Sequence, residues 1–269
     1  MITLDNFEKV DEYELSLVPE DNDVGGGRIT KEEIDNIREF PNAKSLKISG
    51  LNQENFEYLI SRYGNQFEAI AFFKNKTISD LSILGSLNNI KYIYYFFNQK
   101  AADLWDMTNN KNLIGLGIYD FSKLHTIEMI PTAPTLQFFS IGNKVWGTAE
   151  IESLKPLTQS AVTHFAWWGK KILDNDFQCL AKSRVTELDL NIRSFRMEEL
   201  AHIVASIPGL CGKATTPYRE FGIHENEKST VYYNLCKGKR SLIKGKDESK
   251  LKEYLAEFDG LVEKYRANG

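Results

Sequence analysis

The residue types that carry covalent or metal chemistry are few and scattered in this sequence. Catalytic and metal motifs such as CxxC, HExxH, GxSxG, the P-loop and GxGxxG do not occur. A cysteine and a histidine could still meet in the folded chain as a nucleophile and its base, and Cys236 and His224 are the candidates. We therefore expect no enzyme, no metal and no cofactor, and keep a Cys/His enzyme in the C-terminal segment as the alternative. The cysteines and histidines are Cys179, Cys211, Cys236, His125, His164, His202 and His224.

A second candidate is a basic cluster near the C-terminus. Five of the ten residues from 237 to 246 are Lys or Arg, which indicates contact with an anion or a nucleic acid. The alternative is a solvated hairpin whose strand edge is protected by lysines. The whole chain has a net charge of −4, which argues against nucleic acid as the partner. The cluster is Lys237, Lys239, Arg240, Lys244 and Lys246.

The composition indicates a soluble globular protein. Apolar residues make up 42% of the 269 residues and charged residues 26%. No apolar run approaches the roughly 18 residues of a membrane span, so we expect no membrane partner. The acidic N-terminus is unlike a signal peptide, and the odd number of cysteines argues against a disulfide framework. We therefore expect a cytoplasmic protein.

A repeat of about 23 residues organises most of the chain. Seven segments fall into register, beginning at residues 43, 67, 90, 113, 136, 162 and 185, and their positions 1, 4 and 6 are apolar or aromatic in all 21 cases. A second apolar pattern follows each segment at intervals of three, as in Ile78, Leu81, Leu84 and Leu87, which is typical of a 3₁₀ turn. Such a unit buries its apolar face only by stacking on copies of itself, so the strands should form a parallel sheet.

The LxxLxLxxN spacing resembles a leucine-rich repeat, and FEAIAFFKNKTISDLSILGSLNN matches it best. The irregular repeats of 22–23 residues are similar to those of internalins and of phosphatase regulators. The resemblance implies an α/β fold: a leucine-rich-repeat solenoid with a curved parallel sheet, a 3₁₀ or helical convex side and terminal caps. The family's asparagine stands at Asn75 and Asn98, whereas the other repeats must close the bend differently.

We expect three regions. Residues 1–42 hold 12 acidic and 4 basic residues and should form an acidic N-terminal cap, with a capping box at Thr30 and Glu33. Residues 43–210 should form seven leucine-rich repeats. Residues 211–269 should form a small C-terminal cap, with a hairpin turning at Gly238 and an amphipathic helix after Asp247.

The strand positions that the core does not need predict the function. Positions 3, 5 and 7 point to the concave face, where aromatic residues alternate with glycine and alanine in the middle repeats. Exposed aromatic patches mark interaction sites, so we predict a non-enzymatic module that binds another protein or a peptide there. The alternatives are cover by a terminal segment, a homodimer, or a one-residue error of register. The predicted partner-binding residues are Phe73, Tyr92, Tyr94, Phe96, Tyr119, Phe138, His164 and Trp168.

Overall fold

The computed structural model describes residues 1–19, 27–225 and 228–267. The chain divides into two compact units, Met1–Arg184 and Val185–Gly269. The predicted boundary between repeats and C-terminal cap, at residue 210, falls within the second unit and stays a prediction.

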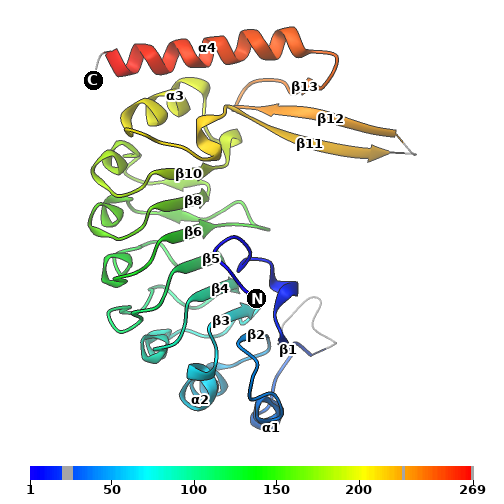
Figure 1. Ribbon diagram of the computed structural model, residues 1–269, viewed down its shortest axis with the longest axis vertical. Helices are drawn as coiled ribbons and strands as arrows, with labels where there is room; N and C mark the ends of the chain where they lie inside the picture. Colours follow the sequence, from blue (N-terminus) through cyan, green and yellow to red (C-terminus); the bar gives the residue numbers. More distant parts are fainter. Residues whose placement is uncertain (20–26, 226–227, 268–269) are drawn as a thin grey trace. The chain divides into compact units, whose positions relative to one another are not determined.

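The first unit is built on a parallel sheet to which each repeat contributes one strand (Figure 1). Tyr92 pairs with Ala69 on one side and with Gly115 on the other, and Gly115 pairs with Phe138. This is the register predicted from the sequence. Along the sheet the strands are β1 (Leu15–Leu17), β2 (Ser45–Ile48), β3 (Ala69–Phe73), β4 (Tyr92–Asn98), β5 (Gly115–Phe121), β6 (Phe138–Gly142) and β8 (His164–Trp168).

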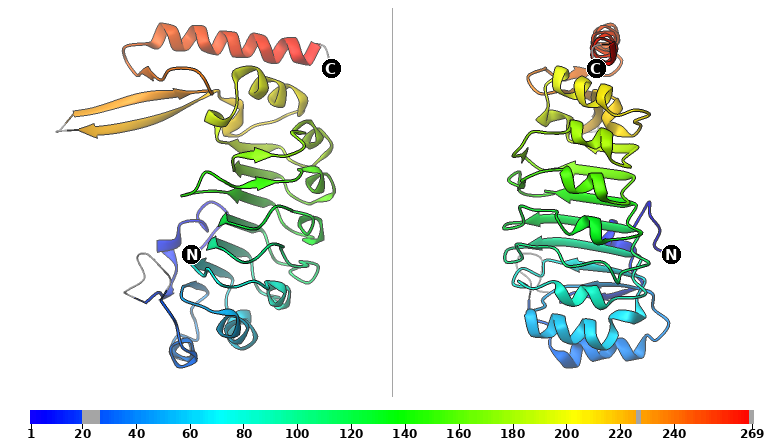
Figure 2. Two further views of the ribbon diagram at one scale, coloured as in Figure 1. Left: turned by 180° about the vertical axis from the view of Figure 1, so that it is seen from behind. Right: turned by 90° about the vertical axis from the view of Figure 1, so that its left-hand side faces the viewer.

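The return path of each repeat lies on the opposite side of the sheet, as the two views of Figure 2 show. Two helices occupy it at the start, α1 (Lys31–Asp35) and α2 (Gln53–Tyr63), and β7 (Glu150–Ile151) pairs with β9 (Lys171–Ile172) later in the unit. The later returns are 3₁₀ turns, at Ser82–Ser86, Ile130–Thr132, Lys155–Gln159 and Gln178–Lys182. The chain thus has the α/β leucine-rich-repeat solenoid fold that the sequence predicts.

The core of the first unit lies between the sheet and these returns. Strand positions 4 and 6, such as Ile70 and Phe72 in β3, are fully buried, and so are Leu84 and Leu87 of the first 3₁₀ return. Burial of such side chains contributes about 1.5–3 kcal/mol each. A one-residue error of register is therefore ruled out for these strands, because it would turn the apolar set to the other face.

The bends that end strands β2 to β5 use a left-handed residue. Gly50, Lys74, Phe97 and Asp120 occupy the same repeat position, with φ between +54° and +79°. From the second bend to the fourth, an asparagine or aspartate side chain binds the backbone of a neighbouring repeat. Asn75 accepts from Leu51 N at 2.9 Å and donates to Ile48 O at 3.0 Å.

In the fourth bend, at the end of β5, Phe121 replaces the asparagine, and the preceding Asp120 makes the hydrogen bonds to the next repeat. The Asp120 carboxylate accepts hydrogen bonds from the backbone N–H groups of Lys144 and Trp146, both at 2.9 Å. This is how one repeat without the asparagine closes its bend.

The second unit contains the last strand of the repeat pattern, β10 (Glu187–Leu190), and α3 (Met197–Ser206). An antiparallel hairpin follows, β11 (Tyr218–Glu225) with β12 (Lys228–Leu235), and β13 (Leu242–Ile243) pairs with β12. The predicted hairpin at Gly238 corresponds to β12 and β13, whereas β11 was not predicted. The predicted terminal helix is α4 (Glu248–Ala267), and it buries Leu251, Tyr254, Phe258 and Val262.

Candidate interaction face

The concave face consists of the residues at repeat positions 3, 5 and 7 in strands β2 to β6 and β8. Tyr94 is 4% exposed, Phe96 8% and Tyr119 1%. The expectation that these three side chains are exposed is therefore wrong. They belong to a buried cluster on the side of the sheet away from the repeat core, together with Phe7 and Tyr13.

The cover is the N-terminal segment, which we call the strap and define as residues 1–14. It lies over the concave face and leads into β1, which joins the edge of the sheet beside β2 (Figure 1). The alternative that a terminal segment covers the face thus describes the structure. The capping box at Thr30 and Glu33 is confirmed, with the Thr30 hydroxyl accepting from Glu33 N and the Glu33 carboxylate accepting from Thr30 N.

Phe7 is the apolar anchor of the strap and is 1% exposed. Its ring stacks on Tyr92 at 5.4 Å between centroids and meets Phe138 edge-on at the same distance. Gly115 forms the floor of this seat, because a Cβ there would lie 2.9 Å from Phe7 Cε1. Two aromatic rings and a glycine therefore form a seat for one planar side chain.

Glu8 is the polar anchor. The Tyr119 hydroxyl donates to its carboxylate and also hydrogen-bonds Ser140 Oγ. Burial and the neighbouring Glu8 charge raise the pKa of Tyr119 well above its ordinary value of 10.0, so Tyr119 stays a neutral donor. Lys144 Nζ lies 4.2 Å from the Tyr119 ring centroid and 4.8 Å from that of Tyr94, an arrangement that favours the cation.

Burial lowers the pKa of Lys144, and the charges of Glu8 and Asp120 oppose this shift. Lys144 as a residue is exposed, so solvent partly screens its attraction to the Glu8 carboxylate.

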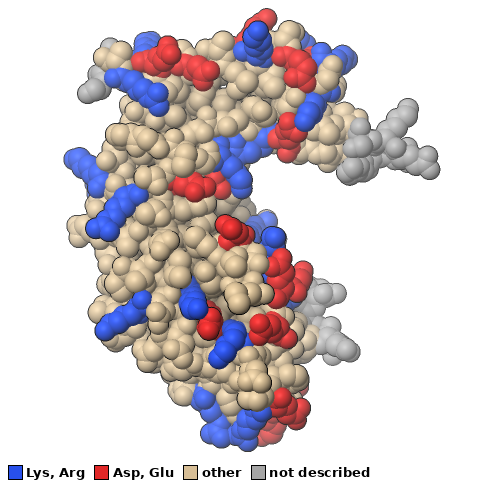
Figure 3. Space-filling view, viewed as in Figure 1, with Lys and Arg blue, Asp and Glu red and all other residues tan. Residues whose placement is uncertain are grey.

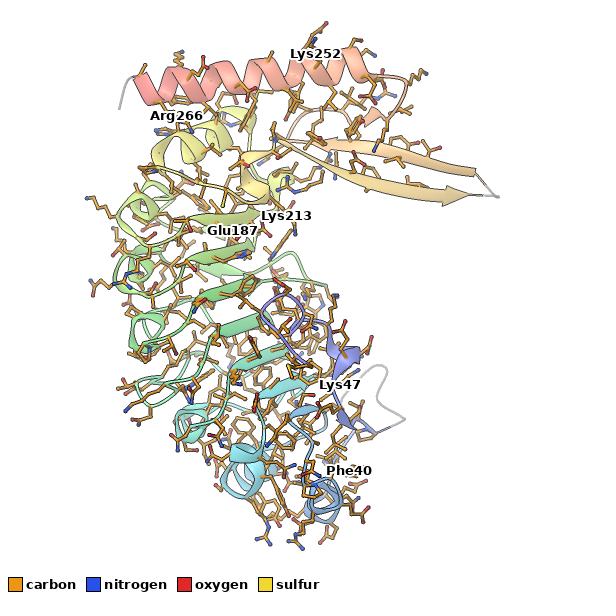
Figure 4. The ribbon with its side chains drawn as sticks, in the orientation of Figure 1. Phe40, Lys47, Glu187, Lys213, Lys252 and Arg266 are labelled. Carbon is orange, nitrogen blue, oxygen red and sulfur yellow. The ribbon has the colours of Figure 1, made fainter. Side chains whose placement is uncertain are left out.

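Two further contacts fix the rest of the strap. The Tyr13 hydroxyl donates to Phe7 O at 2.6 Å, and burial raises the pKa of Tyr13. Asp11 pairs with Lys47 at 3.0 Å, and Lys47 Nζ lies 5.0 Å from the Phe73 ring centroid. Figure 4 places Lys47 beside the strap. Asp11 is 92% exposed, so this pair contributes little to stability.

Part of the predicted face stays accessible. Phe73, Phe138, His164 and Trp168 are half-buried, whereas Tyr92 is buried under Phe7. The Phe138 and His164 rings lie 4.3 Å apart. Acidic and basic side chains are interspersed over the visible surface of the first unit (Figure 3).

The sequence reasoning missed Phe7, Glu8 and Tyr13, because it interpreted the N-terminus as a polar cap. Two signals were available. Phe7 and Tyr13 are aromatic residues within an acidic segment, and Gly115 and Gly117 interrupt the aromatic columns of the face. Both glycines lie beneath the strap, since a Cβ at Gly117 would be 2.8 Å from Glu8 Oε1.

The alternative catalytic candidates, Cys236 and His224, lie in the second unit. Cys236 is buried, with its Sγ 3.6 Å from Pro217 O, and burial raises the pKa of its thiol, which disfavours the thiolate. Burial also raises the pKa of Cys179 to about 11. The side chain of His224 lies outside the described part of the chain.

The basic cluster is exposed along residues 237–246. Lys244 is paired with Glu220 at 2.7 Å, so part of its charge is neutralised locally. Anion binding by this cluster stays a prediction. Within the described ranges, no three His, Cys, Asp or Glu side chains are grouped to hold a metal ion. None of the described helices has the length and apolar character to cross a bilayer.

Searches of protein-family models and of curated proteins find no match. Among solved structures, internalin C2 of Listeria monocytogenes is similar, with 20% identity and a TM-score of 0.39, over 68% of this chain and 73% of its own. Another internalin of the same organism is 17% identical with a TM-score of 0.43, over 78% of this chain and 68% of its own.

Proposed function

We propose that the protein is an interaction module that binds another protein or a peptide through its concave face. The observation that carries this proposal is the strap itself. The face holds a peptide segment of the same chain by an aromatic seat and a polar anchor, and a surface built in this way is suited to hold a segment of another chain.

The accessible rim supports the proposal. Phe73 and Trp168 lie at opposite ends of the buried cluster and are packed against it, while part of each side chain remains in solvent. Aromatic side chains that are half-buried around a desolvated centre are typical of binding hot spots. We expect a partner that binds across the face to contact at least one of these two rings.

The test is site-specific photocrosslinking in a lysate of the source organism. A benzophenone-bearing phenylalanine analogue replaces Phe73 or Trp168, so an aromatic side chain is kept at each position. The matched control carries the analogue at Phe40, a phenylalanine that is 47% exposed and lies beside α1, away from the face (Figure 4). We expect a discrete adduct from positions 73 and 168 and none from position 40.

Adducts of the same pattern from all three positions, or from position 40 alone, would mean that the concave face is not the binding surface. Absence of adducts from positions 73 and 168 would count against the proposal in the same way.

A further inference from the structure

We infer that the face takes an acidic peptide in which a phenylalanine is followed directly by a glutamate, and that the strap is a copy of this ligand within the chain, which must leave before a partner binds. The inference rests on the proposed function and specifies the partner. Its evidence is the way in which strand β5 holds Phe7 and Glu8.

Two glycines of β5 contact two neighbouring residues of the strap. A Cβ at Gly115 would meet the Phe7 ring at 2.9 Å, and a Cβ at Gly117 would meet the Glu8 carboxylate at 2.8 Å. Gly115 and Gly117 are alternate strand residues, so both face the strap and lie about 7 Å apart. Any larger residue at either position would push the corresponding ligand side chain away.

The walls of the two places differ in chemistry. Around Phe7 they are the rings of Tyr92 and Phe138, which prefer an aromatic guest. Around Glu8 they are the Tyr119 hydroxyl, which donates to the carboxylate, and the nearby Lys144 ammonium. Because a donor and a cation converge there, a neutral side chain in place of the glutamate would leave Lys144 with Asp120 as its remaining nearby acid, and a basic one would repel it.

The strap is held by side chains rather than by strand pairing. From residue 3 to residue 12, the described backbone hydrogen bonds join strap residues to one another, as in Phe7 N to Thr3 O at 3.1 Å and Lys9 N to Asn6 O at 2.8 Å. Pairing with the sheet begins at Leu15. A peptide from another chain can supply the same side chains without replacing a strand of the sheet.

Charge complementarity points to an acidic ligand. The strap has five acidic residues and one lysine, and two of the acids, Asp11 and Glu8, lie near lysines of the face, Lys47 and Lys144. The strap also competes with any partner, because a tethered segment has an effective concentration on the order of millimolar. Only chains whose strap is away can bind a partner, so the measured affinity equals the intrinsic affinity multiplied by the fraction of such chains.

The test uses the full chain and a synthetic peptide of residues 1–14 with a fluorophore at its C-terminus. Binding is measured by fluorescence anisotropy for the wild type and for the double variant Phe7→Ala/Glu8→Ala, which weakens the strap and leaves the face intact. We expect the double variant to bind the peptide at least about tenfold more tightly, which is the ratio if the strap is away in about one wild-type chain in ten. A control peptide with Phe7→Ala and Glu8→Gln should bind at least about tenfold more weakly than the native peptide.

Two further variants keep the test decisive if the double variant folds poorly. Glu8→Lys retains the aromatic anchor and repels Lys144, so it should also bind the native peptide more tightly than the wild type. Gly115→Ala, added to either strap variant, should abolish the gain, because its methyl group occupies the aromatic seat. Far-UV circular dichroism of each variant shows that the sheet is retained.

Several results would overturn the inference. One is that neither strap variant binds the peptide although both remain folded. Another is that the wild type binds the peptide as tightly as the strap variants do. A wild-type dimer in analytical ultracentrifugation that Phe7→Ala/Glu8→Ala converts to monomer would make a second copy the occupant in place of a separate partner. If crosslinks form at positions 73 and 168 but no variant binds the peptide, the proposed function stands and this ligand is wrong.

Discussion

Asn98 shows how one side chain closes the bend between two repeats. Its amide donates to Ile78 O at 2.9 Å, and its carbonyl accepts from the backbone N–H groups of Lys100 and Ala101, each at 2.8 Å. Asn98 is fully buried, and its hydrogen bonds to Ile78 O and Ala101 N are buried as well, so these two backbone groups could not turn to water if the side chain were removed. The asparagine is therefore required for backbone hydrogen bonding rather than for packing.

We predict that Asn98→Ala lowers the free energy of unfolding by about 3 kcal/mol, because each buried polar group left without a partner costs about 1–3 kcal/mol. Urea denaturation measures the change. Asn109→Ala, at an exposed position, is the control and should shift stability by less than about 0.5 kcal/mol. Equal effects of the two substitutions would contradict this role of Asn98.

Asp35 provides a prediction of pH dependence. Hydrogen bonds from Tyr63 and Tyr58, with a smaller effect of Arg38 and Arg62, lower the pKa of Asp35 from its ordinary value of 3.8. Because the folded pKa lies below the unfolded one, the stabilisation is fully present above pH 3.8 and is lost as the pH falls through the folded value.

The urea midpoints of the wild type and Asp35→Asn should therefore differ at pH 7 and converge in the acid range below the ordinary pKa. A difference that stays constant down to the lowest pH at which the chain folds would mean that the Asp35 charge contributes nothing.

At the scale of the element, strap and strand differ in how they are held. The amides of Phe7 and Lys9 are bonded within the strap, whereas those of β4 and β5 take part in sheet pairing over a buried core. Segments anchored by a few side chains open with lower free energies than core strands.

We predict that hydrogen exchange is faster in residues 3–12 than in β4 and β5, and that Phe7→Ala accelerates exchange in the strap alone. Exchange measured by mass spectrometry resolves these segments. Thr30→Ala is the control: it removes the N-cap of α1, at a cost of about 1 kcal/mol, and should affect that helix only. A strap that exchanges as slowly as β5 in both chains would be a permanent part of the core.

The strands and their register could be predicted from the sequence because apolar positions 1, 4 and 6 recur in every repeat, as Leu46, Ile70 and Ile93 do at position 4. Cover by a terminal segment was one alternative from the sequence, but the seat of Phe7 on Tyr92 could not be predicted, because these residues are far apart and share no pattern. Strand β11 was missed because YREFGIHE mixes charges with a glycine and does not alternate clearly. The left-handed bend was hidden because Lys74 and Phe97 occupy it instead of glycine.

At the scale of the whole molecule, each of the two units has a core of its own. In the second unit, α3 contacts α4. Phe258 of α4 is buried, with 2% of its surface exposed. In the first unit, the core lies between the sheet and the returns. In repeat proteins each repeat is stabilised mainly by the repeats next to it rather than by a single core.

We predict that Phe258→Ala destabilises the second unit by about 3–5 kcal/mol, the usual cost of removing a buried phenylalanine. Hydrogen exchange should accelerate within residues 185–267 and stay unchanged within residues 1–184. Uniform acceleration over the chain would show that the two units unfold as one.

Tryptophan fluorescence should report whether the concave face is occupied, because of where the tryptophans lie. Trp105, whose indole N–H donates to Asn110 Oδ1 at 2.8 Å, and Trp167 are buried in the first unit, so their emission should stay constant. Trp168 and Trp146 are half-buried; Trp168 packs against the cluster that the strap completes, and Trp146 lies 4.3 Å from the Phe97 ring of its edge. We expect water to gain access to these two indoles when Phe7 leaves. The emission maximum should therefore move to longer wavelength in Phe7→Ala and return when a ligand refills the seat, so that the unlabelled chain reports its own state.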